Sequence, residues 1–459
     1  MAVLKGLPIK APVRKENKMP DSSELFGPGG PGGPGGGPGF EDNSDCKAAI
    51  AVTGGTLEVA APSEIFGGTY TSNAAEGVKI VSYDGTTGGV FVENSTYSVD
   101  GATISLSGRG KGLAGRCTAL GVKDRGVLTV KNAVVYTNGK AKSCTSAEEN
   151  SVLRVYDSIL ISMGQPYGAG VPAVEGPAAS PPPALEIEGN SRTHCTMSNS
   201  SSYFTRCKII TDGWAALSTD AAMGYVYLQA DDCQVISTKS GYAVYADGGC
   251  HDVINRCKID AACMGAILGG ESDVVFRDSQ LVCGTYGALM HSVNGKDTEV
   301  GTLTFSNCTV KTKQELVRVK SDNTMIHVRS SSVETGNGVL VRTMVNDDPI
   351  ATKVGPEPVY GVRIHFEDTA ANGDLLHNDP EREMWVSMAG SVLQGAIQNA
   401  MLSMDLGSKW VATGDSQVVL ASDIDEAQLD AVSGVTITAK GGAPLERTLP
   451  SGGKLVVLC

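Results

Sequence analysis

Three residues that could exchange protons recur at nearly equal spacing along this chain. Tyr227, His251 and Asp273 are separated by 24 and 22 residues. A histidine next to a carboxylate can act as a general base near neutral pH, and a tyrosine can donate or receive a proton. If the fold stacks these three side chains, they form an acid–base site.

A second set of polar side chains stands two residues further along the same repeated unit: Arg154, Glu186, Tyr203 and Gln229. An arginine could bind an anionic or enolate oxygen. Both sets together are suited to removing a proton next to a carbonyl group, followed by elimination or isomerisation. Glycoside hydrolysis would instead need two carboxylates about 5–9.5 Å apart. Glu186 or Glu271 with Asp273 could supply them, which makes hydrolysis the second choice.

Further candidates lie next to these sets. Asp247, Glu271 and His291 are expected around the turn that leads into the same face, and Tyr167 lies in a proline-rich insertion that could act as a lid. Taken singly, tyrosine and histidine are ordinary residues of exposed strands, and aspartate is common in turns. The predicted catalytic residues are Tyr203, Tyr227, His251 and Asp273. The predicted substrate-binding residues are Tyr167, Arg154, Glu186, Gln229, Asp247, Glu271 and His291.

A repeated sequence motif sets the register that positions these side chains. It returns six times between residues 203 and 333, as FTRCKI, ADDCQV, INRCKI, FRDSQL, FSNCTV and VRSSSV. In a common register, small or thiol side chains occupy one column, at intervals of 22–29 residues: Cys207, Cys233, Cys257, Ser279, Cys308 and Ser331. Such a period, built from short alternating strands, is typical of a solenoid.

The sequence therefore predicts an all-β fold, a right-handed parallel β-helix with rungs of about 22–29 residues and capped ends. The cysteine column should form a ladder inside it. Alternate side chains of a strand point to opposite faces, and parallel strands lie about 4.8 Å apart. The polar sets should then form two continuous lines on the outside.

The chain divides into three predicted parts. Residues 1–45 contain the run GPGGPGGPGGGPG and are expected to be a flexible or extended tail, with wrapping around a neighbouring subunit as an alternative. Residues 46–400 are the expected β-helix, with insertion loops at 164–184, 190–201 and 346–358. Residues 401–459 are expected to be terminal rungs and a cap that covers the open strand edge.

Composition excludes several classes of partner. A net charge of −13 argues against nucleic acid, and no run of 18 apolar residues predicts a membrane span. No CxxC or Cys/His spacing predicts a metal or cofactor, although carboxylates distant in sequence could still bind Ca²⁺.

The cellular compartment is predicted from the amino terminus and the cysteines. The first 20 residues lack the apolar core of a secretory signal, and buried thiols suit a reducing compartment. We expect a cytoplasmic protein, or a secreted one if a signal was removed. Disulfides between Cys46 and Cys117 or between Cys144 and Cys195 stay open.

The carboxy-terminal part carries the segments GDLLHND (373–379), SVLQGAI (391–397), SKWVATGDS (408–416) and GVTITA (434–439). This pattern resembles the adhesin-like β-helix proteins of gut and soil bacteria, and the architecture of residues 100–459 is similar to that of the pectate-lyase-like superfamily. No calcium-binding carboxylate cluster, catalytic-arginine motif or paired-aspartate pattern of that superfamily maps onto this chain, so no catalytic residue is carried over.

We therefore expect an enzyme of the lyase or isomerase type that needs no cofactor. Its substrate would be a small polyhydroxylated compound, such as a uronate, a sugar acid or a phenolic ring, bound in a cleft on the outer face. The alternatives are a non-catalytic glycan-binding or adhesin-like surface solenoid and, second, a glycoside hydrolase. Trp214 and Tyr242 are expected to form a ring-stacking platform or the contact of a homo-oligomer.

Overall fold

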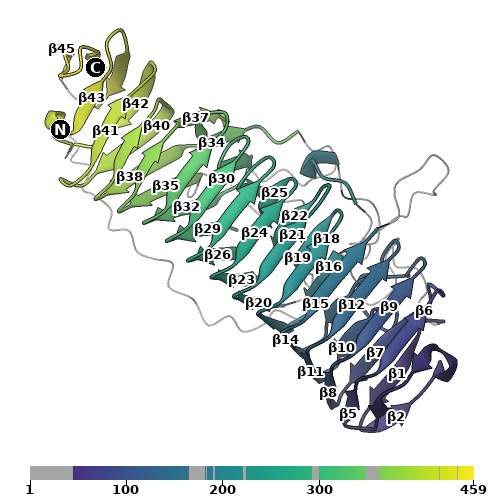
Figure 1. Cartoon of the computed structure of the whole chain (residues 1–459). Coiled ribbons are helices and arrows are strands. Elements are labelled where there is room, and N and C mark those ends of the chain that lie inside the picture. Colours follow the sequence, from purple (N-terminus) through teal and green to yellow (C-terminus); the bar gives the residue numbers. More distant parts are fainter. Residues whose placement is uncertain are drawn as a thin grey trace.

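The computed structural model describes residues 45–164, 181, 183–189, 192–220, 224–291, 299–347, 361–422, 424–441 and 443–458. These residues form one long right-handed parallel β-helix, as the sequence predicts (Figure 1). The predicted tail up to residue 44, most of the insertions 164–184 and 346–358, and Tyr167 lie outside the described residues.

Each complete rung contributes three strands, and equivalent strands of successive rungs pair in parallel to form three walls. Wall A consists of β1 (Lys47–Thr53), β7 (Thr87–Glu93), β10 (Leu120–Lys123), β13 (Thr145–Ala147), β16 (Arg192–Met197), β19 (Ala215–Asp220), β22 (Tyr242–Asp247), β25 (Met264–Gly269), β28 (Ala288–Met290), β31 (Val317–Lys320), β34 (Val339–Met344) and β37 (Asp374–Asn378).

Wall B follows wall A in each rung. Its strands are β5 (Ala74–Glu76), β8 (Thr96–Asp100), β11 (Val127–Lys131), β14 (Val152–Tyr156), β17 (Ser201–Thr205), β20 (Val226–Asp231), β23 (Cys250–Asn255), β26 (Asp273–Arg277), β29 (Gly301–Ser306), β32 (Thr324–Arg329), β35 (Val362–Glu367) and β38 (Met384–Ala389). Walls A and B merge at β40 (Ile397–Met404), which pairs with both β37 and β38.

Wall C completes each rung. Its first sheet contains β3 (Ile65–Phe66), β6 (Lys79–Ser82), β9 (Thr103–Ser107), β12 (Val134–Asn138), β15 (Ile159–Met163), β18 (Lys208–Thr211), β21 (Gln234–Ser237), β24 (Lys258–Ala261), β27 (Gln280–Cys283), β30 (Thr309–Thr312) and β33 (Ser332–Thr335), which are parallel except for the antiparallel pair β3–β6. A separate parallel sheet of β36 (Ala370–Asn372), β39 (Val392–Gln394), β41 (Lys409–Ala412) and β43 (Leu429–Ala431) follows it.

Antiparallel pairs lie near both ends of the solenoid. Near the amino-terminal end, β2 (Thr56–Glu58) pairs with β1, and β4 (Thr69–Tyr70) pairs with β5. At the other end, β42 (Ser416–Leu420), β44 (Thr436–Lys440) and β46 (Lys454–Leu458) extend the merged wall, and β45 (Leu445–Thr448) folds back on β46. The 3-10 turns are η1 (Pro62–Glu64), η2 (Pro183–Leu185) and η3 (Glu426–Gln428).

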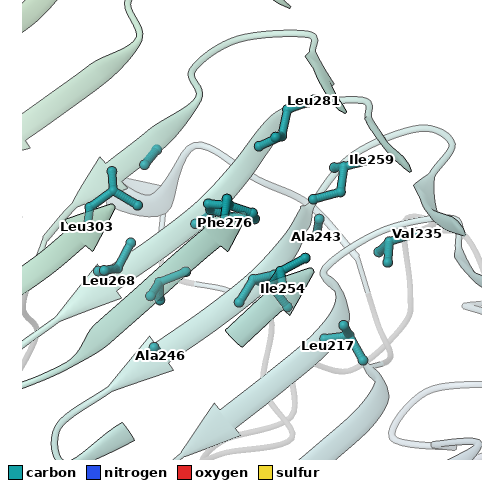
Figure 2. Close-up of a cluster of buried hydrophobic side chains, with 14 of the residues drawn as sticks. Leu217, Val235, Ala243, Ala246, Ile254, Ile259, Leu268, Phe276, Leu281 and Leu303 are labelled. Atoms are coloured by element: carbon teal, nitrogen blue, oxygen red, sulfur yellow. The ribbon is translucent and has the colours of Figure 1, made fainter. Parts of the chain in front are cut away.

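The core fills the space between the three walls. Figure 2 shows Ile254 and Phe276 of wall B, Ile259 of wall C and Leu268 of wall A as members of one apolar cluster. The rings of Phe276 and Phe305, from successive rungs, stack with their centroids 5.4 Å apart. Stacking of rungs therefore buries apolar side chains that no single rung could cover.

The cysteine column forms the predicted interior ladder at the corner between walls B and C. The backbone N–H of Cys207 donates to Cys233 Sγ, and that of Cys233 donates to Cys257 Sγ, both at 3.4 Å. Ser279 Oγ accepts from the backbone of Cys257 at 3.0 Å. Each ladder side chain thus satisfies a buried amide of the preceding rung.

Left-handed residues turn the chain just before each ladder position. Arg206, Asp232, Arg256, Asp278 and Asn307 have φ values of 53°, 56°, 51°, 50° and 54°. Asparagine and aspartate tolerate this region better than most side chains. The two-residue corner therefore repeats without glycine, which keeps the register of wall C tied to that of wall B.

We expect Cys233→Ser to change the free energy of unfolding by less than about 1 kcal/mol, because serine already occupies this column at Ser279 and keeps an acceptor for the amide of Cys207. Cys233→Ala should cost about 1 kcal/mol, because it leaves that buried amide without an acceptor. Guanidinium denaturation of both variants measures the difference, and equal stabilities would show that the column acts through volume alone.

One of the two disulfides that the sequence left open is present. Cys46 and Cys117 are joined, and they link the start of β1 to a turn 71 residues later. Cys144 and Cys195, the other pair that the sequence left open, are free and buried. The ladder cysteines are free as predicted.

Two predictions on wall A are also wrong. Residues 190–201 are not an insertion loop, because residues 192–197 form β16, in register with β13 and β19. Trp214 and Tyr242 are not an exposed platform or a subunit contact, since they are 5% and 0% exposed. They pack under Leu185 and Ile187, two residues that follow the predicted 164–184 insertion and fold back onto wall A.

Candidate functional site

The predicted outward line on wall B exists. Register pairs Tyr227 with His251 and His251 with Asp273 on successive strands β20, β23 and β26. His251 Nδ1 lies 2.8 Å from Asp273 Oδ2, and the rings of Tyr227 and His251 stack at 5.6 Å. Tyr203 lies at 5.6 Å from Tyr227 on the other side. We call Tyr203, Tyr227, His251 and Asp273 the wall-B row.

Hydrogen bonds fix the tyrosine of this row. Tyr227 Oη donates to Gln229 Oε1 at 2.8 Å, and Gln229 Nε2 donates to Asp231 Oδ2 at 2.6 Å. Burial, together with the charges of Tyr203, Tyr225 and Asp231, raises the pKa of Tyr227. The phenol therefore stays protonated and can donate a proton or a hydrogen bond more readily than it can receive a proton.

The second predicted line is right in part. Arg154 is the register partner of Tyr203, and its guanidinium lies 5.7 Å from the centre of that ring. Gln229 follows Tyr203 in the same register. Glu186 does not belong to this line, because residues 183–189 lie on wall A instead.

A more enclosed group of polar side chains lies on the outer face of wall A. The guanidinium of Arg192 stands 4.8 Å from the ring centre of Trp214 and 5.5 Å from that of Tyr245. Its Nη1 lies 3.2 Å from Asp220 Oδ2, and Tyr245 Oη donates to Asp247 Oδ2 at 3.0 Å. We call Arg192, Asp220, Tyr245 and Asp247 the wall-A cluster.

The two carboxylates of the wall-A cluster are neighbours in the parallel register of β19 and β22. Burial is the main cause that raises the pKa of Asp247 to about 6, and the charge of Asp220 adds to it. The hydrogen bond from Tyr245 opposes the rise. Asp247 therefore exchanges its proton near neutral pH, whereas Asp220 is paired with Arg192. Carboxyl groups with shifted pKa values gather at functional sites.

Burial also raises the pKa of Tyr245 well above its ordinary value, and the charge of Asp247 contributes. Its hydroxyl remains a donor at every physiological pH. Nε of Arg192, a residue only 6% exposed, has no hydrogen-bond partner among the described residues. The cluster thus contains a carboxylate that can accept a proton (Asp247), a hydroxyl that stays protonated (Tyr245) and an N–H group without an acceptor among the described residues (Arg192 Nε).

The other residues predicted around the turn differ in accessibility. Glu271 is exposed between β25 and β26, whereas His291 is 2% exposed behind β28. Asp247, predicted only to bind substrate, stands at the centre of the wall-A cluster. These three residues therefore lie at the turn from wall A to wall B, where the sequence predicts them, and differ in exposure.

A strap of residues 183–189 crosses the outer face of wall A. Leu185 and Ile187 are buried against Trp214, Met264 and Leu289. At one end the backbone N–H of Trp214 donates to Glu188 O at 2.7 Å, and at the other Lys320 Nζ donates to Ala184 O at 2.8 Å. The insertion predicted as a lid over wall B thus has its described end fixed on wall A.

Asp322, a buried residue just after β31, is a further titratable group. Its Oδ1 accepts from the backbone N–H of Asn323 at 3.0 Å, and its Oδ2 is buried without a partner in the described part of the chain. Burial is the main cause that raises its pKa to about 7. The interactions that lower it, from Asn323 and Arg382, are weaker.

Sequence reasoning missed Arg192, Asp220, Tyr245 and Asp322. A signal was present for Asp220, since Asp220 and the predicted Asp247 both end short strands 27 residues apart, close to the repeat period. Spacing counted from the corner between walls B and C does not reach this column on wall A.

Neither a metal centre nor a membrane helix is found in the described ranges. No three His, Cys, Asp or Glu side chains there are arranged to hold a metal ion. No helix there is long and apolar enough to cross a membrane.

Comparison with known proteins finds similarity among solved structures only. No protein-family model and no curated protein matches the sequence. Among solved structures, the chain is similar to the tailspike protein gp49 from Pseudomonas phage LKA1, at 11% identity and a TM-score of 0.34. The match covers 77% of this chain and 50% of the tailspike, so the chain spans half the length of that protein.

Proposed function

We propose that this β-helix is an enzyme that carries out acid–base chemistry without a cofactor at the wall-A cluster. The observation that carries the proposal is Asp247, a carboxyl group with a pKa of about 6 that is fixed by the Tyr245 hydroxyl at 3.0 Å. A buried carboxylate whose pKa lies near the working pH is suited to general base catalysis.

The chemistry follows from the protonation states of this cluster. Ionised Asp247 accepts a proton from a carbon next to a carbonyl or carboxyl group of the substrate. As Asp247 takes up that proton, the Tyr245 hydroxyl releases its hydrogen bond to this carboxyl group and donates to the substrate oxygen on which charge develops. Elimination or isomerisation then completes the reaction, with Asp247 returning the proton to the leaving group or to a second carbon. A polyhydroxylated substrate suits the polar edge and the aromatic rings beside it.

A second location for the same chemistry is favoured by one observation on wall B. His251 Nδ1 lies 2.8 Å from Asp273 Oδ2, so the tautomer protonated at Nδ1 faces the carboxylate and leaves Nε2 as the basic nitrogen. Nε2 has no hydrogen-bond partner within the described residues. The wall-B row is more open, since the side chains of His251 and Asp273 are 24% and 40% exposed, and solvent weakens the electrostatic part of catalysis.

Two variants separate these locations. Turnover of uronates, sugar acids and phenolic acids by the wild type is followed by the ultraviolet absorbance of unsaturated products and by deuterium uptake from heavy water. Asp247→Asn should lower turnover by about 10²- to 10⁴-fold, and His251→Gln should preserve it. The reverse pattern moves the site to wall B, and no effect from either variant contradicts both locations. Gln234→Ala, an exposed position of wall C, is the control.

A further inference from the structure

Three donors of wall A hold one carboxylate of the strap. Tyr286 Oη donates to Glu186 Oε2 at 2.7 Å. Lys320 Nζ and Arg318 Nη1 lie 3.1 and 3.3 Å from Glu186 Oε1. These partners follow Glu186 by 100 to 134 residues in the chain, so the contact exists only through the tertiary fold. We call Tyr286, Arg318 and Lys320 the carboxylate cradle.

The cradle is built to hold a negative charge. Lys320 is 2% exposed, and a buried ammonium group without a counter-charge is costly. The guanidinium of Arg318 lies 4.2 Å from the ring centre of Tyr286 and is held by Glu315 at 3.2 Å. Its Nε has no hydrogen-bond partner in the part of the chain that the structure describes.

The cradle favours the ionised form of the Glu186 carboxylate. Burial opposes its ionisation, but hydrogen bonds from Tyr286 and Lys320 and the charge of Arg318 outweigh burial and lower its pKa. Asp347, whose side chain is 61% exposed, gives Lys320 a further contact at 3.2 Å. An anion in the cradle is therefore ionised across the physiological pH range.

The backbone of the strap is strained at this residue. Glu186 has φ of +57°, a region that costs free energy for residues other than glycine. Its side chain is nevertheless 34% exposed, while the neighbouring Leu185 and Ile187 are buried. The carboxylate can thus rotate out of the cradle while the two apolar anchors stay seated.

The cradle lies on the same side of wall A as the wall-A cluster. Register places Asp220, Asp247 and Gly269 in one outward column, and Lys320 continues it on β31. Three strand spacings separate Asp247 from Lys320, which is about 14 Å at the usual distance between parallel strands. One extended ligand could reach both.

We infer that the carboxylate cradle is a binding subsite for a carboxylate group of the ligand, and that Glu186 competes with the ligand for it. The side chain of Glu186 occupies the cradle as a substitute for that group. The inference deepens the proposed function, on which it rests for the second end of the ligand: the substrate is a carboxylate-bearing polyhydroxylated compound long enough to span three rungs.

Binding calorimetry with D-glucuronate and D-glucose, two probes that differ in the carboxylate, tests the cradle without any turnover. Glu186→Gln removes the competing charge and keeps the side-chain size, so glucuronate should bind about tenfold more tightly than to the wild type, with glucose unchanged. Glu188→Gln is the matched control, because this exposed strap residue holds its neighbours through its backbone.

Three results would overturn the inference: equal glucuronate affinity in Glu186→Gln and Glu188→Gln, an equal gain for glucose, or no detectable glucuronate binding to Glu186→Gln. Unfolding midpoints of both variants confirm that the strap remains anchored. Because no turnover is measured, failure of the proposed acid–base activity leaves this result standing. Failure of the cradle likewise leaves the Asp247 chemistry to be judged by its own variants.

Discussion

The kcat/KM of the enzyme is expected to rise with pH around a midpoint near 6 and to reach a plateau above pH 7. Asp247 is active as a base only when ionised, and its pKa of about 6 sets that midpoint. Below the midpoint the protonated carboxyl group cannot accept the substrate proton. A rate profile between pH 4.5 and 8.5 on a turned-over substrate measures the effect.

Substituting this residue should give the largest loss in the molecule. Asp247→Asn keeps the shape of the side chain but cannot accept a proton, so the rate should fall by about 10²- to 10⁴-fold and the inflection near pH 6 should disappear. Glu334→Gln, an exposed carboxylate on β33 of wall C, should leave both unchanged. If the inflection near pH 6 remains in Asp247→Asn, the inflection belongs to the titration of another group.

The neighbouring carboxylate offers a finer test of the same assignment. The charge of Asp220 helps to raise the pKa of Asp247. Asp220→Asn should therefore move the midpoint of the rate profile to lower pH. A residue that only supported the fold would lower the rate without moving the midpoint.

Replacing Asp252 by valine is expected to stabilise the protein by about 1–3 kcal/mol at neutral pH. Asp252 points into the core of the solenoid and is 0% exposed, between Leu228 and Val274 of the adjacent strands. Thr219 Oγ1 lies 3.1 Å from its Oδ2, but its Oδ1 has no partner within the described ranges. Valine would continue the aliphatic column and remove the buried polar atoms.

The sign of the pH dependence follows from the pKa of this group. Burial raises the pKa of Asp252 well above its ordinary value of 3.8. Below that ordinary value both the folded and unfolded chains are protonated, and the carboxyl group adds no pH-dependent cost. As pH rises, the unfolded chain releases its proton first, so the unfolded state gains and stability falls until the folded pKa is reached.

Guanidinium denaturation at pH 4, 6 and 8 measures this dependence. The advantage of Asp252→Val over the wild type should grow with pH. Asp260→Asn, an exposed aspartate on wall C of the same rung, should show no such trend. A pH-independent difference between Asp252→Val and the wild type would mean that packing alone explains the gain.

The fold itself could be predicted because the repeat is local. Alternation of inward and outward side chains has a period of two, and the ladder from Cys207 to Ser331 marks the same point of every rung. Once rungs stack in that register, the contacts of Tyr227 with His251 and of His251 with Asp273 follow. For wall B, the spacing in the sequence therefore predicts which side chains are neighbours on successive rungs.

On wall A, sequence spacing does not predict side-chain position, and the reason is local. Ala243 and Val244 both point into the core, so Tyr242 and Tyr245 both face outward and the alternation is interrupted. A register counted from the corner between walls B and C therefore predicts the wrong inward and outward residues beyond this interruption. The wall-A cluster consequently escaped the sequence pattern, although Asp247 was among the candidates.

The amino-acid sequence by itself thus determined the β-helix, the thiol ladder and the outward row of wall B, because each depends on spacing within one repeat. Only the tertiary structure decided where the titratable side chains are most enclosed. Glu186 reaches Tyr286, Arg318 and Lys320 through a strap that no repeat encodes. The pKa of Asp247 depends on burial and on Asp220 of the adjacent rung, which are properties of the assembled wall rather than of any one segment.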